Sequence, residues 1–232
     1  MLGVIVNTAA VIAGSVIGLV FKKGIPEKYV ESIMTGIGLC TIYIGISGTL
    51  KGENTLILIL SIVLGAIAGT LLNIDGRINR LGDKIERSLE KEGNPAGSVA
   101  GGFITASLLF CVGAMAIVGS LNAGLNMDNE MLFTKSMLDF ISSIILAASL
   151  GMGVIFSAGF VFVFQGIIVL MAQYLEPVLT DSAIAEITCT GSLLILALGF
   201  NLIKLTRIKV ANYLPALILA PLISWAVMEF IK

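Results

Sequence analysis

The chain has no histidine and few charged residues. Among its 232 residues, Lys, Arg, Asp and Glu together make up 12%, whereas soluble domains carry roughly 25%. So little charge cannot cover a globular surface, which excludes a soluble enzyme, a disordered protein and a coiled coil. The absence of histidine excludes histidine-based metal ligation and proton relays. The formal net charge of −1 excludes a polybasic nucleic-acid binder.

Cysteine is scarce as well. The three cysteines, Cys40, Cys111 and Cys189, all fall inside apolar runs. An odd number of cysteines within a bilayer does not make a disulfide framework, and no zinc-binding spacing is present. We interpret them as small buried side chains and predict no metal site and no cofactor.

Apolar residues are abundant instead, at 57% of the chain, with a mean hydropathy of +1.03. A membrane helix needs roughly 20 mostly apolar residues, and the few charges divide the chain into runs of about that length. We predict an all-α fold, a polytopic transmembrane helical bundle forming one integral membrane domain over residues 1–232. The eight expected spans lie at about 1–21, 31–50, 55–72, 99–121, 132–150, 153–175, 185–203 and 210–230, with Gly151-Met152-Gly153 dividing the fifth from the sixth.

The basic residues predict the orientation of the chain. Eleven of the fourteen lie in the loops after the first, third and seventh spans, which all fall on one side. Because positively charged loops stay in the cytoplasm, we expect both termini to be extracytoplasmic. The start Met1-Leu2-Gly3 lacks the basic region of a signal peptide, so we expect the first span to be retained.

The longest charged segment, residues 74–95, is expected outside the membrane. Its apolar residues recur at helical spacing, as in Ile74, Ile78 and Leu81, and its five basic and five acidic residues balance. This pattern predicts a cytoplasmic amphipathic helix. We favour a linker that lies against the bundle, with a partner or regulatory site as the alternative.

Three short motifs recur in the same order in both halves of the chain. Gly-Val-Ile opens the first and sixth spans, E-x-x-x-T-G lies at 31–36 and 186–191, and K-x-x-N-x-L lies at 51–56 and 209–214. The matches pair spans 1–3 (repeat A, 1–73) with spans 6–8 (repeat B, 153–232), leaving spans 4 and 5 (98–152) between them. The partners are offset by five spans, and an odd offset reverses the direction across the membrane, so the repeat would be inverted. Inverted repeats recur in transporters, with a site near the midplane.

Polar residues inside the spans are the candidates for function. Lys135 and Asp139 lie one helical turn apart in the fifth span, and ionisable groups in a span usually face the interior. They are either a structural ion pair or a pair that contacts a solute or ion. The candidate pathway residues are Asn7, Cys111, Gly113, Met115, Gly119, Ser120, Lys135, Asp139 and Gln165.

Two further pairs occupy equivalent places in the two repeats. Glu31 and Glu186 are expected either to complement a helix dipole or to act as gate or coupling carboxylates. Asn54 and Asn212 are expected as amides at the repeat interface.

The fourth span has low helix propensity around Gly113 and Gly119. We favour a continuous helix that packs through these glycines. The alternative is a break or re-entrant turn, which is tolerated only where it lines a cavity or is buried in protein.

The stretch Thr105-Ala106-Ser107-Leu108-Leu109-Phe110-Cys111-Val112-Gly113-Ala114-Met115-Ala116-Ile117-Val118-Gly119-Ser120 resembles the central signature of a prokaryotic membrane family called domain of unknown function 554. Val6-Asn7-Thr8 with Gly14, Thr134-Lys135-Ser136 to Asp139, and Val210-Ala211-Asn212 through Ala216 resemble it too. The resemblance covers nearly the whole chain. It implies a bacterial or archaeal inner-membrane protein, sometimes labelled a transport protein, and supplies no substrate and no catalytic residues.

The leading hypothesis is therefore a transporter or channel that moves a small solute or ion across the cytoplasmic membrane through an inverted-repeat bundle. We expect no catalytic residues, because neither an HExxH nor a GxSxG motif is present. The expected partners are the lipid bilayer, an unknown small solute or ion, and further copies of the chain in a homo-oligomer, with no nucleic acid. The alternative is a non-transporting membrane scaffold or regulatory protein that acts through the amphipathic helix.

Overall fold

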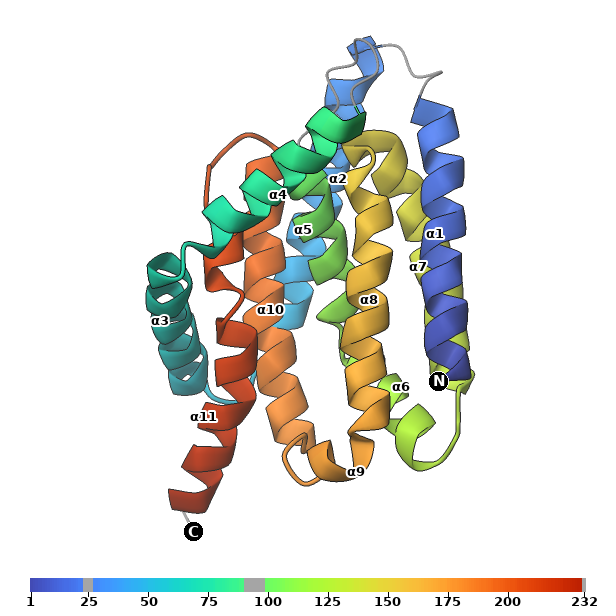
Figure 1. Cartoon of the computed structure of the whole chain (residues 1–232). Helices are drawn as coiled ribbons and strands as arrows, with labels where there is room; N and C mark the ends of the chain where they lie inside the picture. The colour runs from blue at the N-terminus through green and yellow to red at the C-terminus, as the bar shows by residue number, and fades with distance from the viewer. Residues whose placement is uncertain (23–26, 90–98, 231–232) are drawn as a thin grey trace. The chain divides into compact units, whose positions relative to one another are not determined.

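The structure is a computed structural model that describes residues 1–22, 27–89 and 99–230 (Figure 1). Every regular element in these ranges is a helix, so the predicted all-α class is confirmed. The elements are α1 (Leu2–Lys22), α2 (Glu27–Thr49), α3 (Thr55–Leu71), α4 (Ile74–Leu89), α5 (Val99–Cys111), α6 (Ala114–Leu125), α7 (Glu130–Leu150), α8 (Gly153–Leu170), α9 (Ala172–Leu175), α10 (Asp181–Leu202), the 3₁₀ turn η1 (Val210–Tyr213) and α11 (Ala216–Phe230).

The described residues contain five to seven candidate membrane spans. Five segments are long and apolar enough to cross a bilayer, and two bent helix pairs raise the number to seven if each pair is one span. The apolar part of α2, Met34–Thr49, is shorter. A polytopic helical membrane protein is thus confirmed, whereas the count of eight spans stays a prediction. The five are Leu2–Phe21, Glu130–Leu150, Gly153–Leu170, Asp181–Leu202 and Val210–Val227.

The predicted fourth span is broken. It consists of α5 and α6, which are bent by 60° relative to each other. The expectation of a continuous helix is therefore wrong, and the alternative of a break is what the structure has. The two glycines differ in their surroundings. Gly113 lies in the break and is exposed, whereas Gly119 lies inside α6, where an added Cβ would come within 3.1 Å of Leu132.

The predicted turn between the fifth and sixth spans is confirmed. Helix α7 ends at Leu150 and α8 begins at Gly153, so the chain reverses over two residues. Gly151 has φ 83° and ψ −153°, a backbone conformation that is essentially restricted to glycine. This reversal sets α8 antiparallel to α7.

The predicted amphipathic helix begins at Ile74, where α4 starts, and α4 ends at Leu89. The remainder of the predicted segment, up to residue 95, lies outside the described residues. The preceding Asn73 has a positive φ of 47°, which asparagine tolerates better than most residues. Asn73 therefore ends α3 and lets the chain turn into α4.

The chain divides into two compact units that interleave along the sequence. Unit 1 comprises Met1–Ile33, Arg77–Cys111 and Met115–Ala172. Unit 2 comprises Met34–Gly76, Val112–Ala114 and Gln173–Lys232.

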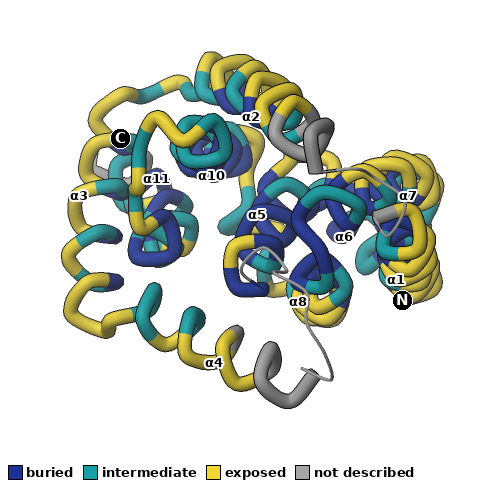
Figure 2. The backbone as a smooth tube through the Cα atoms, turned by 90° about the horizontal axis from the view of Figure 1, so that it is seen from above, coloured by how far each residue is buried: buried dark blue, intermediate teal, exposed yellow. Residues whose placement is uncertain are grey.

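In unit 1, α1 packs along α7 through small residues. An added Cβ would meet Leu132 at Gly3, Ser143 at Gly14 and Ala147 at Gly18. Because both numbers in these pairs rise together, the two helices run parallel. The buried residues of α1 recur every three to four positions and form one face, while the other face is exposed (Figure 2). The exposed face is apolar, as expected of a helix that contacts lipid.

Another close pair in unit 1 is α5 with α8. An added Cβ at Gly153 would meet Val99 and Phe103. The ring of Phe103 also packs edge-on against that of Phe160, with centroids 6.1 Å apart. Ten of the thirteen residues of α5 are buried, so α5 is a core helix of this unit.

Unit 2 is held by two antiparallel pairs. Gly65 and Gly69 of α3 face Ala216 and Asn212, which occur in the reverse order along the chain. Likewise, α2 packs on α10, with Gly45 against Leu196 and Gly48 against Ser192. Ser61, Gly65 and Gly69, small residues spaced four apart along α3, are buried. Small residues let membrane helices approach closely enough to gain dispersion contacts.

Candidate functional site

The predicted pair Lys135 and Asp139 forms a buried ion pair in unit 1. The two side chains lie one turn apart on α7, and Nζ of Lys135 is 2.8 Å from both Oδ1 and Oδ2 of Asp139. The residues are only 6% and 5% exposed. Burying one of these charges alone would be costly, so each makes the burial of the other tolerable.

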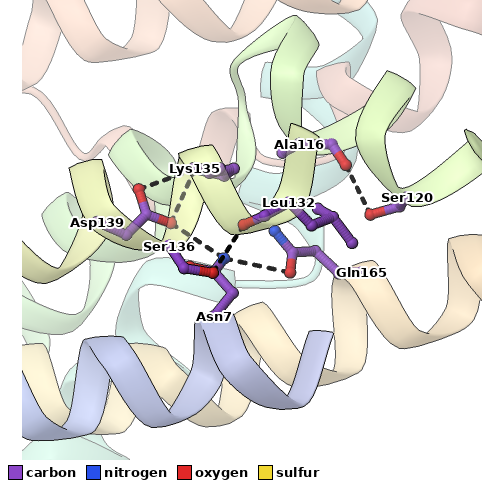
Figure 3. Close-up of polar contacts among 8 residues, drawn as sticks. All are labelled: Asn7, Ala116, Ser120, Leu132, Lys135, Ser136, Asp139 and Gln165. Atoms are coloured by element: carbon purple, nitrogen blue, oxygen red, sulfur yellow. Dashed lines mark hydrogen bonds and ion pairs between the residues drawn. The ribbon is translucent and has the colours of Figure 1, made fainter. Parts of the chain in front are cut away.

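Two amides complete a polar cluster around this pair (Figure 3). Asn7 of α1 uses Nδ2 to donate to Oδ2 of Asp139 at 3.1 Å and to Oε1 of Gln165 at 3.2 Å. Gln165 comes from α8, and both amides are fully buried. We call Asn7, Lys135, Asp139 and Gln165 the polar cluster. It brings together four of the predicted pathway residues from three helices.

The polar cluster is incompletely satisfied. Oδ1 of Asn7 and Nε2 of Gln165 are buried and have no hydrogen-bond partner in the protein. An unpaired buried polar group costs about 1–3 kcal/mol, and nearly all such groups in folded proteins find a partner. The cluster therefore presents one free acceptor and one free donor.

Helix α5 and the part of α6 from Met115 onward, which flank the break, belong to unit 1 together with the polar cluster. Cys111, the last residue of α5, is buried and lies near Lys135 and Asp139. After the break, Gly119 of α6 packs against Leu132 of α7. Ser120 donates to the carbonyl of Ala116 at 2.6 Å. Helices α5 and α6, on the two sides of the break, thus both contact α7, which carries Lys135 and Asp139.

Two of the predicted pathway residues are exposed rather than enclosed by protein. Gly113 is exposed, and an added Cβ there would meet no atom within 4 Å. Met115 is exposed as well. Neither the backbone angle nor close packing therefore requires glycine at position 113.

Glu186 serves a different helix from the one expected. It lies five residues after the start of α10, too far in to complement that helix end. Its Oε1 instead accepts the N–H groups of Glu53 at 2.8 Å and Asn54 at 2.7 Å, directly before α3. Asn54 is the N-cap of α3, and its side chain accepts the N–H of Leu56 at 3.0 Å. The structure thus brings two predicted residues of unit 2 together at the start of one helix.

Asn212 also supports a helix start. Its Oδ1 accepts the N–H of Asp75 at 2.9 Å, at the beginning of α4. Glu31 lies in α2, but its side chain is outside the part of the chain whose side chains are described, so no partner is assigned to it.

Sequence reasoning missed Asn129. Its Oδ1 accepts the N–H of Gly3 at 2.9 Å, at the start of α1, and its Nδ2 donates to the carbonyl of Met127. The available signal was its position directly before α7, typical of an N-cap. That signal predicts a cap for α7, whereas the side chain accepts an N–H group at the start of α1 instead.

These features define an integral membrane protein made of apolar helices, with a buried polar cluster and a broken span. The chain belongs to the family described as "Protein of unknown function (DUF554)", which matches residues 2–225. This confirms the resemblance inferred from the sequence.

Two relatives are similar over nearly their whole length. The "Uncharacterized membrane protein YdfK" of Bacillus subtilis (strain 168) is 35% identical over 99% of this chain and 98% of its own. The "Uncharacterized protein YqgA" of Escherichia coli (strain K12) is 30% identical over 97% of each chain. No solved structure matches.

Proposed function

We propose that this protein transports a small polar solute or ion across the cytoplasmic membrane, past the polar cluster of unit 1. The observation that carries the proposal is the pair of buried, unpartnered atoms in that cluster, Asn7 Oδ1 and Gln165 Nε2. Ionisable residues inside membrane segments are expensive and usually mark a functional pathway. A purely structural cluster would be expected to satisfy its own hydrogen bonds.

The broken span supports the same proposal. Broken helices expose backbone carbonyl and N–H groups, which transporters use to bind their substrates. Here α5 and α6, on the two sides of the break, both contact α7, which carries Lys135 and Asp139 of the polar cluster. The open space at Gly113 is consistent with a solute approaching the backbone there.

Helix directions support an inverted repeat as the frame for transport. The proposed partners are α1 with α8, α2 with α10, and α3 with α11. Each pair runs antiparallel: α2 with α10 and α3 with α11 from their glycine contacts, and α1 with α8 because α1 is parallel to α7 and α8 reverses from it. An inverted repeat requires opposite directions for all three pairs.

A swelling assay tests the proposal without a known substrate. Proteoliposomes are shifted into hyperosmotic glycerol, urea or glycine, or into NaCl or KCl, and re-swelling is followed by stopped-flow light scattering. We expect faster re-swelling than in protein-free liposomes for at least one solute. Asp139→Asn should slow that rate at least about tenfold, corresponding to roughly 1.4 kcal/mol, because Lys135 is left without its counter-charge.

Asp83→Asn is the matched control, because Asp83 is an exposed carboxylate on α4. It should re-swell like the unmodified protein. Equal rates for Asp139→Asn and Asp83→Asn, at equal amounts of folded protein, would remove the polar cluster from the pathway. No solute entering faster than in protein-free liposomes would contradict transport itself.

The scaffold function remains the second candidate because α4 is strongly amphipathic and carries the exposed Leu81. Capture of a specific partner by the full chain, lost in a Leu81→Ser variant whose re-swelling rate is unchanged, would favour this function.

A further inference from the structure

A second incompletely satisfied site lies in unit 2, on α10. Glu186 is fully buried, and only one of its carboxylate oxygens is engaged, through the N–H groups of Glu53 and Asn54. Its other oxygen, Oε2, is buried without a partner. One turn further along α10, the hydroxyl of Thr190 is also buried and unpartnered.

One oxygen of the Glu186 carboxylate is held by backbone groups directly before α3. Two backbone N–H groups point at Oε1, and the N-terminal end of α3 presents a partial positive charge to it. These contacts fix the position of the carboxylate, while Oε2 has no donor in the protein.

The neighbouring threonine on the same helix is a useful contrast. Thr188 donates its hydroxyl to the carbonyl of Ile184 at 2.7 Å, the usual way for a threonine to satisfy itself inside a helix. Thr190 makes no such bond in the protein. Its oxygen is left available on the same helix as the free oxygen of Glu186.

The chemistry of these atoms indicates the class of ligand. Both are hard oxygen donors, which suit alkali and alkaline-earth cations rather than thiophilic metals. A divalent cation would take six or more oxygens, usually with several carboxylates, and the described residues contain no cluster of three acidic, Cys or His side chains. A single carboxylate neutralises a single positive charge, and any uncompensated charge in the interior is costly.

We propose that Glu186 Oε2 and Thr190 Oγ1 are ligands of a monovalent cation site, with Na⁺ as its occupant. The site is separate from the polar cluster, and its existence does not depend on the proposed function. If transport is established, it would supply a coupling ion.

Binding of ²²Na⁺ to the purified full-length protein in detergent tests this directly by scintillation proximity. We expect saturable binding that unlabelled NaCl displaces and choline chloride does not. Glu186→Gln and Thr190→Val should each weaken the affinity at least about tenfold, a change of roughly 1.4 kcal/mol. KCl in place of NaCl should displace less.

Thr188→Val is the matched control, since it removes a hydroxyl from the same helix that is already paired. It should bind ²²Na⁺ like the unmodified protein, and Thr190→Ser should retain binding because it keeps the oxygen. If Glu186→Gln does not fold, the comparison of Thr190→Val with Thr190→Ser decides. Absence of saturable ²²Na⁺ binding, or unchanged affinity in folded Thr190→Val, would overturn the site, whereas failure of the swelling assay would leave it standing.

Discussion

At the scale of single residues, the polar side chains of this protein serve helices distant in the sequence. Asn129, Glu186 and Asn212 each accept an N–H group at the start of α1, α3 or α4, across more than a hundred residues. The first N–H groups of a helix have no partner within it. In an apolar medium, where water cannot supply that partner, a distant side chain both satisfies the backbone and fixes where the helix begins.

The cap on α1 gives a direct test of this principle. Asn129→Ala removes the acceptor for the N–H of Gly3 and should destabilise the protein by about 0.5–2 kcal/mol, the usual cost of losing a cap. Asn129→Asp keeps an oxygen in place and should lose less. Unfolding in mixed micelles, followed by circular dichroism, measures the difference.

Asn126→Ala is the control for that experiment, because Asn126 is exposed in the same loop. It should unfold like the unmodified protein. If Asn129→Ala and Asn126→Ala unfold alike, the bond to Gly3 contributes nothing to stability.

The sequence predicted which polar residues would be buried better than it predicted their partners. Asn7, Lys135, Asp139 and Gln165 were all expected on the pathway, because a polar residue in an apolar run must face protein or water. The role of Glu186 could not be foreseen, because its partners are backbone groups of the loop before α3. Backbone N–H groups are the same in every residue, so no sequence pattern identifies them.

At the scale of helices, glycines set the pairing. Gly14 of α1 faces Ser143 and the carbonyl of Phe140 on α7 so closely that any Cβ would collide with them. By contrast, Gly159 of α8 is exposed, and an added Cβ there would meet no atom within 4 Å. The two positions look alike in the sequence, and only the packing separates them.

Alanine at these two glycines should therefore have opposite effects. Gly14→Ala forces α1 away from α7 and should cost about 1–3 kcal/mol, typical of overpacking. Gly159→Ala adds no contact and should be neutral or stabilising by up to about 1 kcal/mol, because alanine favours the helix. Unfolding in mixed micelles gives both values, and equal stability of the two variants would contradict the close α1–α7 contact.

Glycines that look alike in the sequence but differ in packing also explain why the break in the fourth span was not the favoured expectation. Gly113 and Gly119 both lower helix propensity, and a continuous helix was the simpler expectation. Gly119 is stabilised within α6 by packing against Leu132. Gly113 has no such neighbour, so the helix opens there. Other helix boundaries, such as the ends of α3 and the turn at Gly151, were predicted well. Charges or glycines mark these boundaries, and no second signal nearby favours a different position.

At the scale of the whole molecule, composition was sufficient for the class but not for the number of crossings. The low charge and long apolar runs predicted a helical membrane protein, which the apolar helices and the name of the relative from Bacillus subtilis, an uncharacterised membrane protein, both support. The number of spans depends on whether each bent helix pair crosses the bilayer or returns to the same side. Length and hydropathy do not distinguish these paths, because a re-entrant pair is as apolar as a crossing pair.

Cysteine labelling in intact cells tests both the orientation and the α5–α6 path. Single cysteines are placed at the exposed positions Lys84, Asn126, Glu176 and Leu205, after replacement of the three free cysteines. From the distribution of basic residues, we expect a membrane-impermeant maleimide to label positions 126 and 176 in intact cells. Positions 84 and 205 should react only after permeabilisation.

Positions 84 and 126 carry the decisive comparison, because α5 and α6 are the only regular elements described between α4 and Asn126. Labelling on opposite sides means that the broken pair crosses the membrane, as transport past the polar cluster requires. Labelling on the same side means that the pair is re-entrant, which removes one crossing and places both termini on opposite sides if the other spans hold. If positions 84 and 205 are labelled in intact cells, and positions 126 and 176 only after permeabilisation, every crossing is kept and the predicted orientation is reversed. Each labelling pattern therefore corresponds to a single topology.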